Sequence, residues 1–294
     1  MPPTYLERLA ARSAAVGSVL CLGLDPDPTA LPRGFSPDLR GVEAFARLVL
    51  EAAGPYAAAV KPNLAFFEAF GADGLAALER LRAAIPDDLP FVADAKRGDI
   101  GTTAARQAVA LFDRLGADAV TASPYLGSEA IAPLLERTDR FAYVLCRTSN
   151  PGAGELQDLV VAADPASGAP AEPLWARVAR RAAAWGPGGT VGLVVGATAP
   201  DELAAIRTIA PGLAMLVPGV GAQGGNVEPV LAHGMATDPP AGGRPGGGLL
   251  VNVSRGIAAA AAEHGPGVRS DPGERLAEAA LSWAGRLPVL SLPG

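Results

Sequence analysis

Residues 90–123 read PFVADAKRGDIGTTAARQAVALFDRLGADAVTAS and contain the repeating unit of this chain. They begin with an apolar run, Pro90 to Lys96, and end with a second one, Ala117 to Ser123. Runs that do not alternate with polar residues are typical of strands buried on both faces. The segment between them begins at Gly101-Thr102-Thr103 and ends at Leu115-Gly116. A threonine hydroxyl can cap the start of a helix and a glycine can end it, so this segment is predicted to be helical. The stretch therefore predicts a strand–helix–strand unit of a parallel sheet.

The same alternation runs along the whole chain. Amphipathic segments, such as Val42 to Ala53, lie between apolar runs rich in Val, Leu and Ala. The expected strands are Val19–Asp25, Ala57–Asn63, Pro90–Lys96, Ala117–Ser123, Phe141–Thr148, Thr190–Ala197, Ala214–Val220 and Leu249–Ser254. Eight strand–helix units favour a closed α/β (β/α)8 TIM barrel, and an open doubly wound sheet is the alternative.

We expect residues 1–294 to form a single barrel domain, because such a barrel commonly takes about 250 residues. Two stretches, 151–171 and 234–248, are rich in Gly, Pro and Ala. No new periodicity flanks either stretch, so both are predicted to be surface loop insertions of the barrel.

Composition excludes several classes of function. The net charge of −6 and the absence of a basic block argue against a nucleic-acid partner, which clustered Lys and Arg would have to bind. The sequence shows neither a signal peptide nor an apolar run long enough to cross a membrane, so we expect a cytoplasmic protein. The two cysteines and two histidines share no metal-ligand spacing, so no metal site is expected.

Charged residues lie where the predicted strands end, at the rim where barrel enzymes carry their chemistry. Strand two ends at Lys61 and strand three at Asp94-Ala95-Lys96. Alternate strand residues share a face, so Asp94 and Lys96 point the same way, Ala95 faces outward, and Lys61 reaches Asp94 from the next strand. Asp99 extends this row from the following loop. The alternative is a rim salt-bridge network without chemistry.

Other candidates lie on the same rim. Asp25 ends strand one and precedes Pro26, so it is either a site residue or a turn residue. Thr103 is either a site residue or a helix cap. The Gly-rich loop from Pro218 to Gly225 follows strand seven, and Arg255-Gly256 follows strand eight. Barrels often bind phosphate between these two loops, where amides and an arginine match its oxygens.

These residues resemble the signature of the orotidine 5′-phosphate decarboxylase family, and most closely its longer bacterial branch. The similarity is highly specific and covers nearly the whole barrel. The matching segments are 91–103 (FVADAKRGDIGTT), 22–25 (LGLD), 61–63 (KPN), 148–152 (TSNPG), the loop from Pro218 to Gln223, and Arg255.

The resemblance implies removal of CO2 from orotidine 5′-monophosphate to give UMP, with no metal or organic cofactor. It implies that Lys96 donates a proton to C6, that Asp94 lies against the departing carboxylate, and that Lys61 holds the charge row and the ribose. It further implies a homodimer in which Asp99 and Thr103 reach the ribose bound in the other subunit.

The resemblance also assigns the remaining contacts with the substrate. Asp25 accepts a hydrogen bond from a ribose hydroxyl, and Gln223 with Arg255 holds the phosphate. Ser149 contacts the pyrimidine, although the adjacent Thr148 is an alternative. The breaking bond leaves a carbanion in the ring plane without an electron sink, so a fixed cation with a transferable proton suits this reaction.

Two rival functions remain open at this stage. Metal-dependent sugar-phosphate decarboxylases resemble the same barrel and share an Asp-x-Lys-x-x-Asp core, but they hold magnesium partly through a carboxylate at the end of strand two, where this chain has Lys61. A non-catalytic UMP-binding barrel needs Gln223 and Arg255, but it has no need of Lys61, Asp94, Lys96 and Asp99 together.

Overall fold

The computed structural model describes residues 2–166, 168–221, 223–262 and 271–290. Within these residues, eight parallel strands form one sheet with the order β2-β1-β10-β9-β8-β5-β4-β3. Its strands are β1 Leu20–Leu24, β2 Ala59–Pro62, β3 Val92–Arg97, β4 Ala119–Ala122, β5 Phe141–Arg147, β8 Val191–Val195, β9 Ala214–Val217 and β10 Leu249–Val253. Single bridges from Val60 to Phe91 and from Asn63 to Asp94 join the two edge strands. The predicted (β/α)8 barrel is therefore confirmed, and the open sheet is excluded.

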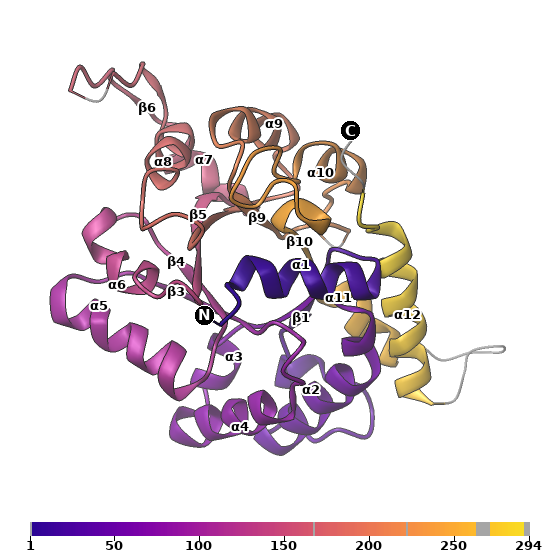
Figure 1. The fold of residues 1–294 in the computed structure, drawn as a ribbon. Helices are drawn as coiled ribbons and strands as arrows, with labels where there is room; N and C mark the ends of the chain where they lie inside the picture. Colours follow the sequence, from indigo (N-terminus) through magenta and orange to yellow (C-terminus); the bar gives the residue numbers. More distant parts are fainter. Residues whose placement is uncertain (1, 167, 222, 263–270, 291–294) are drawn as a thin grey trace.

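Helices surround the strands (Figure 1). The α-helices are α1 Tyr5–Val16, α2 Leu39–Ala53, α3 Ala65–Glu68, α4 Gly71–Ala84, α5 Gly101–Ala108, α6 Ala132–Leu135, α7 Gly154–Gln157, α8 Leu174–Ala182, α9 Pro200–Ile209, α10 Val227–His233, α11 Arg255–Ala258 and α12 Pro272–Arg286. Shorter turns are η1 Pro28–Ala30, η2 Gly54–Tyr56, η4 Ser128–Ala130, η5 Pro151–Ala153, η6 Pro245–Gly248 and η7 Ala259–Ala262, and η3 Val109–Arg114 is a π-helical extension of α5.

Two hydrophobic clusters form the core, one outside the barrel wall and one inside it. One lies between strands and helices and includes Ala95, which confirms that this residue faces outward from the barrel. The other fills the barrel interior and includes Val92, Ala119 and Leu250. Tyr5 and Leu9 of α1 belong to the interior cluster, so this amphipathic helix closes one end of the barrel, as Figure 1 shows. The interior is therefore packed, and the opposite rim carries the strand ends.

The structure differs from the prediction at both stretches that were expected to be surface loops, 151–171 and 234–248. Residues 151–171 are not a plain loop, because they include η5, α7 and strand β6 (Val160–Val161), which pairs antiparallel with β7 (Glu172–Pro173) in a projecting hairpin. Residues 234–248 are not a surface insertion. Ala236 and Ala241 are fully buried in the interior cluster, and η6 packs against α1. The prediction was wrong here because small residues allow close packing as well as loop formation.

The start of α5 also differs from prediction. The cap position is Ile100, and it makes no side-chain cap hydrogen bond. Thr103 is exposed and lies within the first turn of α5, beyond the N-cap position. A capping hydroxyl has to be at the N-cap to accept from the free backbone amides of the first turn. The predicted glycine stop is confirmed, since Gly116 has a φ of +73°.

Among the described residues, no helix is both long enough and apolar enough to cross a bilayer.

Candidate active site

A row of three charged side chains lies at the carboxyl ends of β2 and β3. Lys61 Nζ donates to Asp94 Oδ2 at 2.7 Å, and Lys96 Nζ donates to Asp94 Oδ1 at 2.5 Å. The Lys61 side chain is only 5% exposed, whereas that of Lys96 is 49% exposed. The two lysines therefore share one carboxylate, as the sequence predicted, and the outer one faces the open end of the barrel.

The charges hold one another in their ionised states. Burial raises the pKa of Asp94, but Lys61 and Lys96 outweigh this effect and keep that pKa well below its usual range. Burial alone lowers the pKa of Lys61, yet the carboxylates of Asp94 and Asp25 outweigh it and the pKa is raised. A buried carboxylate and a buried ammonium are thus both charged at neutral pH.

The backbone around Lys96 is not the regular strand that alternation predicts. Pairing of β3 with β4 runs from Ala93 opposite Val120 directly to Arg97 opposite Ala122. Three residues of β3, 94 to 96, therefore lie opposite Thr121 alone, which is a bulge. Lys96 has a φ of +47°, the only positive value of a non-glycine residue in the described part of the chain, and this left-handed conformation costs about 1–2 kcal/mol. Such strain is concentrated at functional sites.

Sequence reasoning missed Thr121. Its side chain is buried, its hydroxyl donates to Asp94 Oδ1 at 2.9 Å, and it accepts from the Lys96 backbone amide at 2.9 Å. A signal was present in the sequence, because Thr121 interrupts an apolar strand two residues after Ala119, which faces the interior.

Asp99 and Thr103 lie apart from the charge row within one chain. Asp99 Oδ1 accepts from the backbone amide of Ile100 at 2.8 Å, and in the described residues no ion pair joins Asp99 to a lysine or arginine. Thr103 is exposed on α5. A single subunit therefore brings together three of the four charged residues that were expected to meet.

Asp25 follows β1 and belongs to the same rim. Its Oδ1 is buried and has no hydrogen-bond partner among the described residues. The same is true of Oδ1 of Asn252 on β10. The charge of Asp25 contributes to the raised pKa of Lys61, which places the two groups near one another. A buried acceptor without a donor is costly in a folded protein, so Asp25 is suited to accept a hydrogen bond from a ligand.

Ser149 and Thr148, which the sequence left as alternatives, have separate partners. Ser149 Oγ donates at 2.7 Å to Oε1 of Gln223, which lies in the Gly-rich loop. The Thr148 hydroxyl donates to Asn150 Oδ1 at 2.6 Å and accepts from Gln157 Nε2 at 2.8 Å. Ser149 is therefore the residue that the fold joins to Gln223. Gly219 has a φ of +97°, a backbone conformation that residues other than glycine rarely adopt, and a Cβ there would lie 3.0 Å from Gln223 Oε1.

Arg255 and Gln223 line a cavity of about 580 Å³ together with Asp25 and Asn63. Asn63 is bridged to Asp94, so the cavity adjoins the charge row. Arg255 is exposed, and the described residues hold no carboxylate in ion-pair contact with it. Gly256 accepts from Trp283 Nε1 through its carbonyl oxygen at 3.2 Å, and the Pro218 carbonyl accepts from Ala197. A guanidinium in the cavity lining, with the ionic row adjoining through Asn63, suits an anionic ligand.

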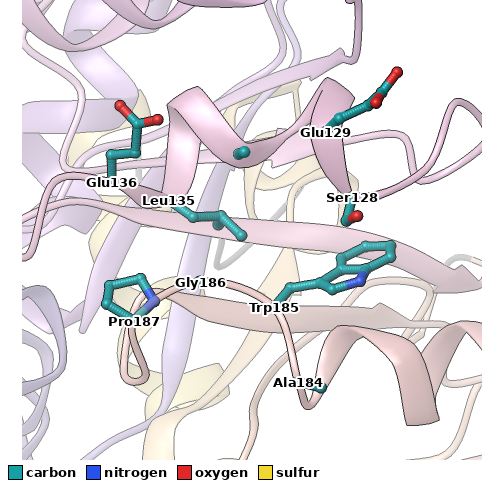
Figure 2. A pocket seen from close by; sticks show the side chains of 9 residues that line it. Ser128, Glu129, Leu135, Glu136, Ala184, Trp185, Gly186 and Pro187 are labelled. Atoms are coloured by element: carbon teal, nitrogen blue, oxygen red, sulfur yellow. The ribbon is translucent and has the colours of Figure 1, made fainter.

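A separate hollow lies between the helices, outside the barrel, and Figure 2 shows its lining. Glu129 and Glu136 extend away from Trp185, so their carboxylates do not converge (Figure 2). No lysine or arginine lines it among the described residues. It therefore lacks the cations that a phosphorylated ligand needs.

No cluster of three or more His, Cys, Asp or Glu side chains with metal-binding geometry occurs in the part of the chain that the structure describes. At the end of β2, where a magnesium-dependent relative would have a carboxylate, the ammonium of Lys61 occupies the position and pairs with Asp94. The charge of that group opposes a divalent cation there.

Comparisons with known proteins establish the family of the chain. The family model described as orotidine 5′-phosphate decarboxylase / HUMPS matches residues 18–265. Orotidine 5′-phosphate decarboxylase of Thermomicrobium roseum is 45% identical over 287 residues, which cover 97% of this chain and 93% of the relative. The enzyme of the same name from Halorubrum lacusprofundi is 48% identical over 255 residues, covering 86% and 87%. The structure of Leishmania donovani OMP decarboxylase superposes with a TM-score of 0.78 at 39% identity, covering 96% and 97% of the two chains. The chain therefore belongs to the orotidine 5′-phosphate decarboxylase / HUMPS family.

Proposed function

We propose that this chain is a carboxy-lyase that converts orotidine 5′-monophosphate to UMP and CO2, the last step of pyrimidine nucleotide synthesis. The observation that carries this proposal is the Lys61–Asp94–Lys96 row, which Asn63 connects to a cavity lined by Gln223 and Arg255. The relatives that bear the name of this activity match the chain over nearly its whole length.

The proposed reaction proceeds by direct cleavage of the bond between C6 and the carboxylate. CO2 leaves, the electron pair stays on C6, and Lys96 Nζ transfers a proton to that carbon. The cation of Lys96 stabilises the charge that develops there. Asp94 lies against the departing carboxylate and repels it in the substrate but not in the product, which is a ground-state effect. Lys61 keeps Asp94 ionised and contacts the ribose.

The other site residues bind the substrate in this proposal. Asp25 accepts from a ribose hydroxyl, and Ser149 contacts the pyrimidine. Gln223 and Arg255 hold the phosphate, with Pro218 and Gly256 forming the adjoining backbone. Phosphate contacts far from C6 close the loop after β9, so remote binding energy assists the chemical step.

The reaction is proposed to need no metal or organic cofactor, because Lys96 supplies both the charge and the proton. The test is to mix the purified protein with orotidine 5′-monophosphate and EDTA and to follow the loss of orotate absorbance. We expect the same rate with and without EDTA. Loss of the activity in EDTA and its return with magnesium would favour the metal-dependent rival, and UMP binding without turnover would favour a binding protein.

We further propose a cytoplasmic homodimer in which residues 1–294 act as one domain. The loops after β3, β4 and β5 carry six exposed large apolar residues: Ile100, Tyr125, Leu126, Leu156, Leu159 and Val160. An apolar surface of this kind at the rim suits a second copy of the chain. Asp99, in the loop after β3, and Thr103, in the first turn of α5, follow the same strand end and would then reach the ribose in the partner's site.

Mixing two inactive variants tests the shared site. Asp99→Ala and Lys96→Ala are each expected to be inactive, but their heterodimer has one site without either substitution. Mixed and re-equilibrated in equal amounts, they should regain about a quarter of the wild-type activity, because half of the dimers are mixed and each has one intact site. The readout is the orotate absorbance assay.

The matched control combines Asp94→Ala with Lys96→Ala, two residues that contact each other in one chain. In their heterodimer each site carries one of the two lesions, so no activity should return. Equal activities of the two mixtures would contradict a site shared between subunits.

A further inference from the structure

The Thr121 hydroxyl closes a ring of contacts around the bulge in β3. It accepts from the backbone amide of Lys96 at 2.9 Å and donates to Asp94 Oδ1 at 2.9 Å, while Lys96 Nζ donates to the same Oδ1 at 2.5 Å. One hydroxyl thus contacts the main chain of the residue that carries the reacting ammonium and the carboxylate that this ammonium pairs with.

The bulge explains why a hydroxyl is needed at this position. In a regular parallel ladder, the amide of a residue in β3 would donate to a carbonyl of the adjacent strand. Because residues 94 to 96 lie opposite Thr121 alone, the ladder is interrupted, and the Lys96 amide donates to the Thr121 hydroxyl at 2.9 Å. The Thr121 hydroxyl replaces that acceptor. A valine of the same shape would leave this amide unsatisfied next to a left-handed backbone.

We propose that Thr121 is a positioning residue of the decarboxylation: it holds Lys96 in its left-handed conformation and orients Asp94, so that the Lys96 ammonium is aimed at C6 of the substrate. This inference rests on the proposed function. Thr121 itself takes no part in bond making or breaking, and it acts through the two residues it contacts. Its effect should therefore be on the chemical step more than on nucleotide binding.

The test compares Thr121→Val, which keeps the shape and removes the hydroxyl, with Thr121→Ser, which keeps the hydroxyl. The matched control is Thr190→Val, because Thr190 is an equally buried threonine whose Oγ1 has no partner among the described residues. For each protein, kcat and KM for orotidine 5′-monophosphate, the Kd for UMP, and the thermal unfolding temperature are measured.

We expect Thr121→Val to lower kcat about 100-fold, the effect of a displacement of about 1 Å at a reacting group. Its Kd for UMP should stay within about threefold of wild type, because ground-state contacts are kept. Thr121→Ser should return kcat to within about tenfold of wild type, and Thr190→Val should leave kcat unchanged. If Thr121→Val does not fold, Thr121→Ala takes its place in the comparison with Thr121→Ser.

Two results would overturn the inference while the proposed function stands. One is an active wild-type protein together with a Thr121→Val variant whose kcat is the same as that of the Thr190→Val control. The other is an equal loss in Thr121→Val and Thr121→Ser, which would assign the effect to packing of the methyl group. A wild-type protein without decarboxylase activity would instead overturn the proposed function, and this inference with it.

Discussion

Lys96→Ala is expected to abolish turnover of orotidine 5′-monophosphate and to leave UMP binding intact. The Lys96 side chain is 49% exposed, and Asp94 keeps its second contact with Lys61, so removing the ammonium does not leave a buried carboxylate unpaired. The variant should therefore fold. It lacks both the cation beside C6 and the transferable proton, and the combined loss in kcat should reach about 10⁴-fold or more.

The measurement is orotate absorbance at high enzyme concentration, together with a calorimetric titration of UMP. Lys96→Arg separates the two roles of the side chain, since a guanidinium keeps the positive charge but does not release a proton at neutral pH. We expect Lys96→Arg to be more active than Lys96→Ala, because the charge beside C6 is restored, and far less active than wild type, because the proton is not supplied. Turnover of Lys96→Ala within about tenfold of wild type would remove this residue from the chemistry.

Arg255→Ala should lower kcat/KM strongly and leave the fold intact. Arg255 is exposed at the start of α11 and lines the cavity that also contains Gln223 and Asp25. Within the described residues its guanidinium pairs with no carboxylate, so the substitution breaks no ion pair in that part of the chain. Two charge-assisted hydrogen bonds to a phosphate correspond to a loss of about 10²- to 10⁴-fold in kcat/KM.

The substrate itself supplies the control for this second variant. Orotidine lacks the phosphate, so its slow turnover should be the same in the wild type and in Arg255→Ala. Arg114→Ala, at the exposed end of η3, removes another arginine far from the cavity and should leave kcat/KM unchanged. Unchanged kinetics of Arg255→Ala with orotidine 5′-monophosphate would exclude Arg255 from the phosphate site.

Most of the fold could be read from the sequence. Seven of the eight predicted runs contain the whole of a barrel strand, and β3 extends one residue beyond its run, to Arg97. The agreement is close because a run of Val, Leu and Ala buried on both faces is a local pattern. The insertion at 234–248 was misread, because its glycines and alanines fit both a loop and a tight contact. Only the neighbouring α1 and the barrel interior show that it is packed.

The candidate site was predicted in part. The prediction that Asp94 and Lys96 meet is confirmed, but it assumed regular alternation, whereas the structure brings them together at a bulge. The register of β3 against β4 depends on contacts between strands, and a single strand's sequence does not contain it. Thr121 was missed for the same reason. Threonine is common in strands, and only the register between β3 and β4 shows that its hydroxyl accepts from the Lys96 amide.

The sequence by itself determined the strand–helix rhythm, the barrel and the residue types at the strand ends, because these depend on periodicity and on short, specific motifs. Only the tertiary structure decided that β3 carries a bulge at residues 94 to 96, that Ser149 rather than Thr148 joins Gln223, and that Thr121 contacts a left-handed Lys96. These features arise from register, closure and hydrogen bonds between residues far apart in the chain, and no local pattern encodes them.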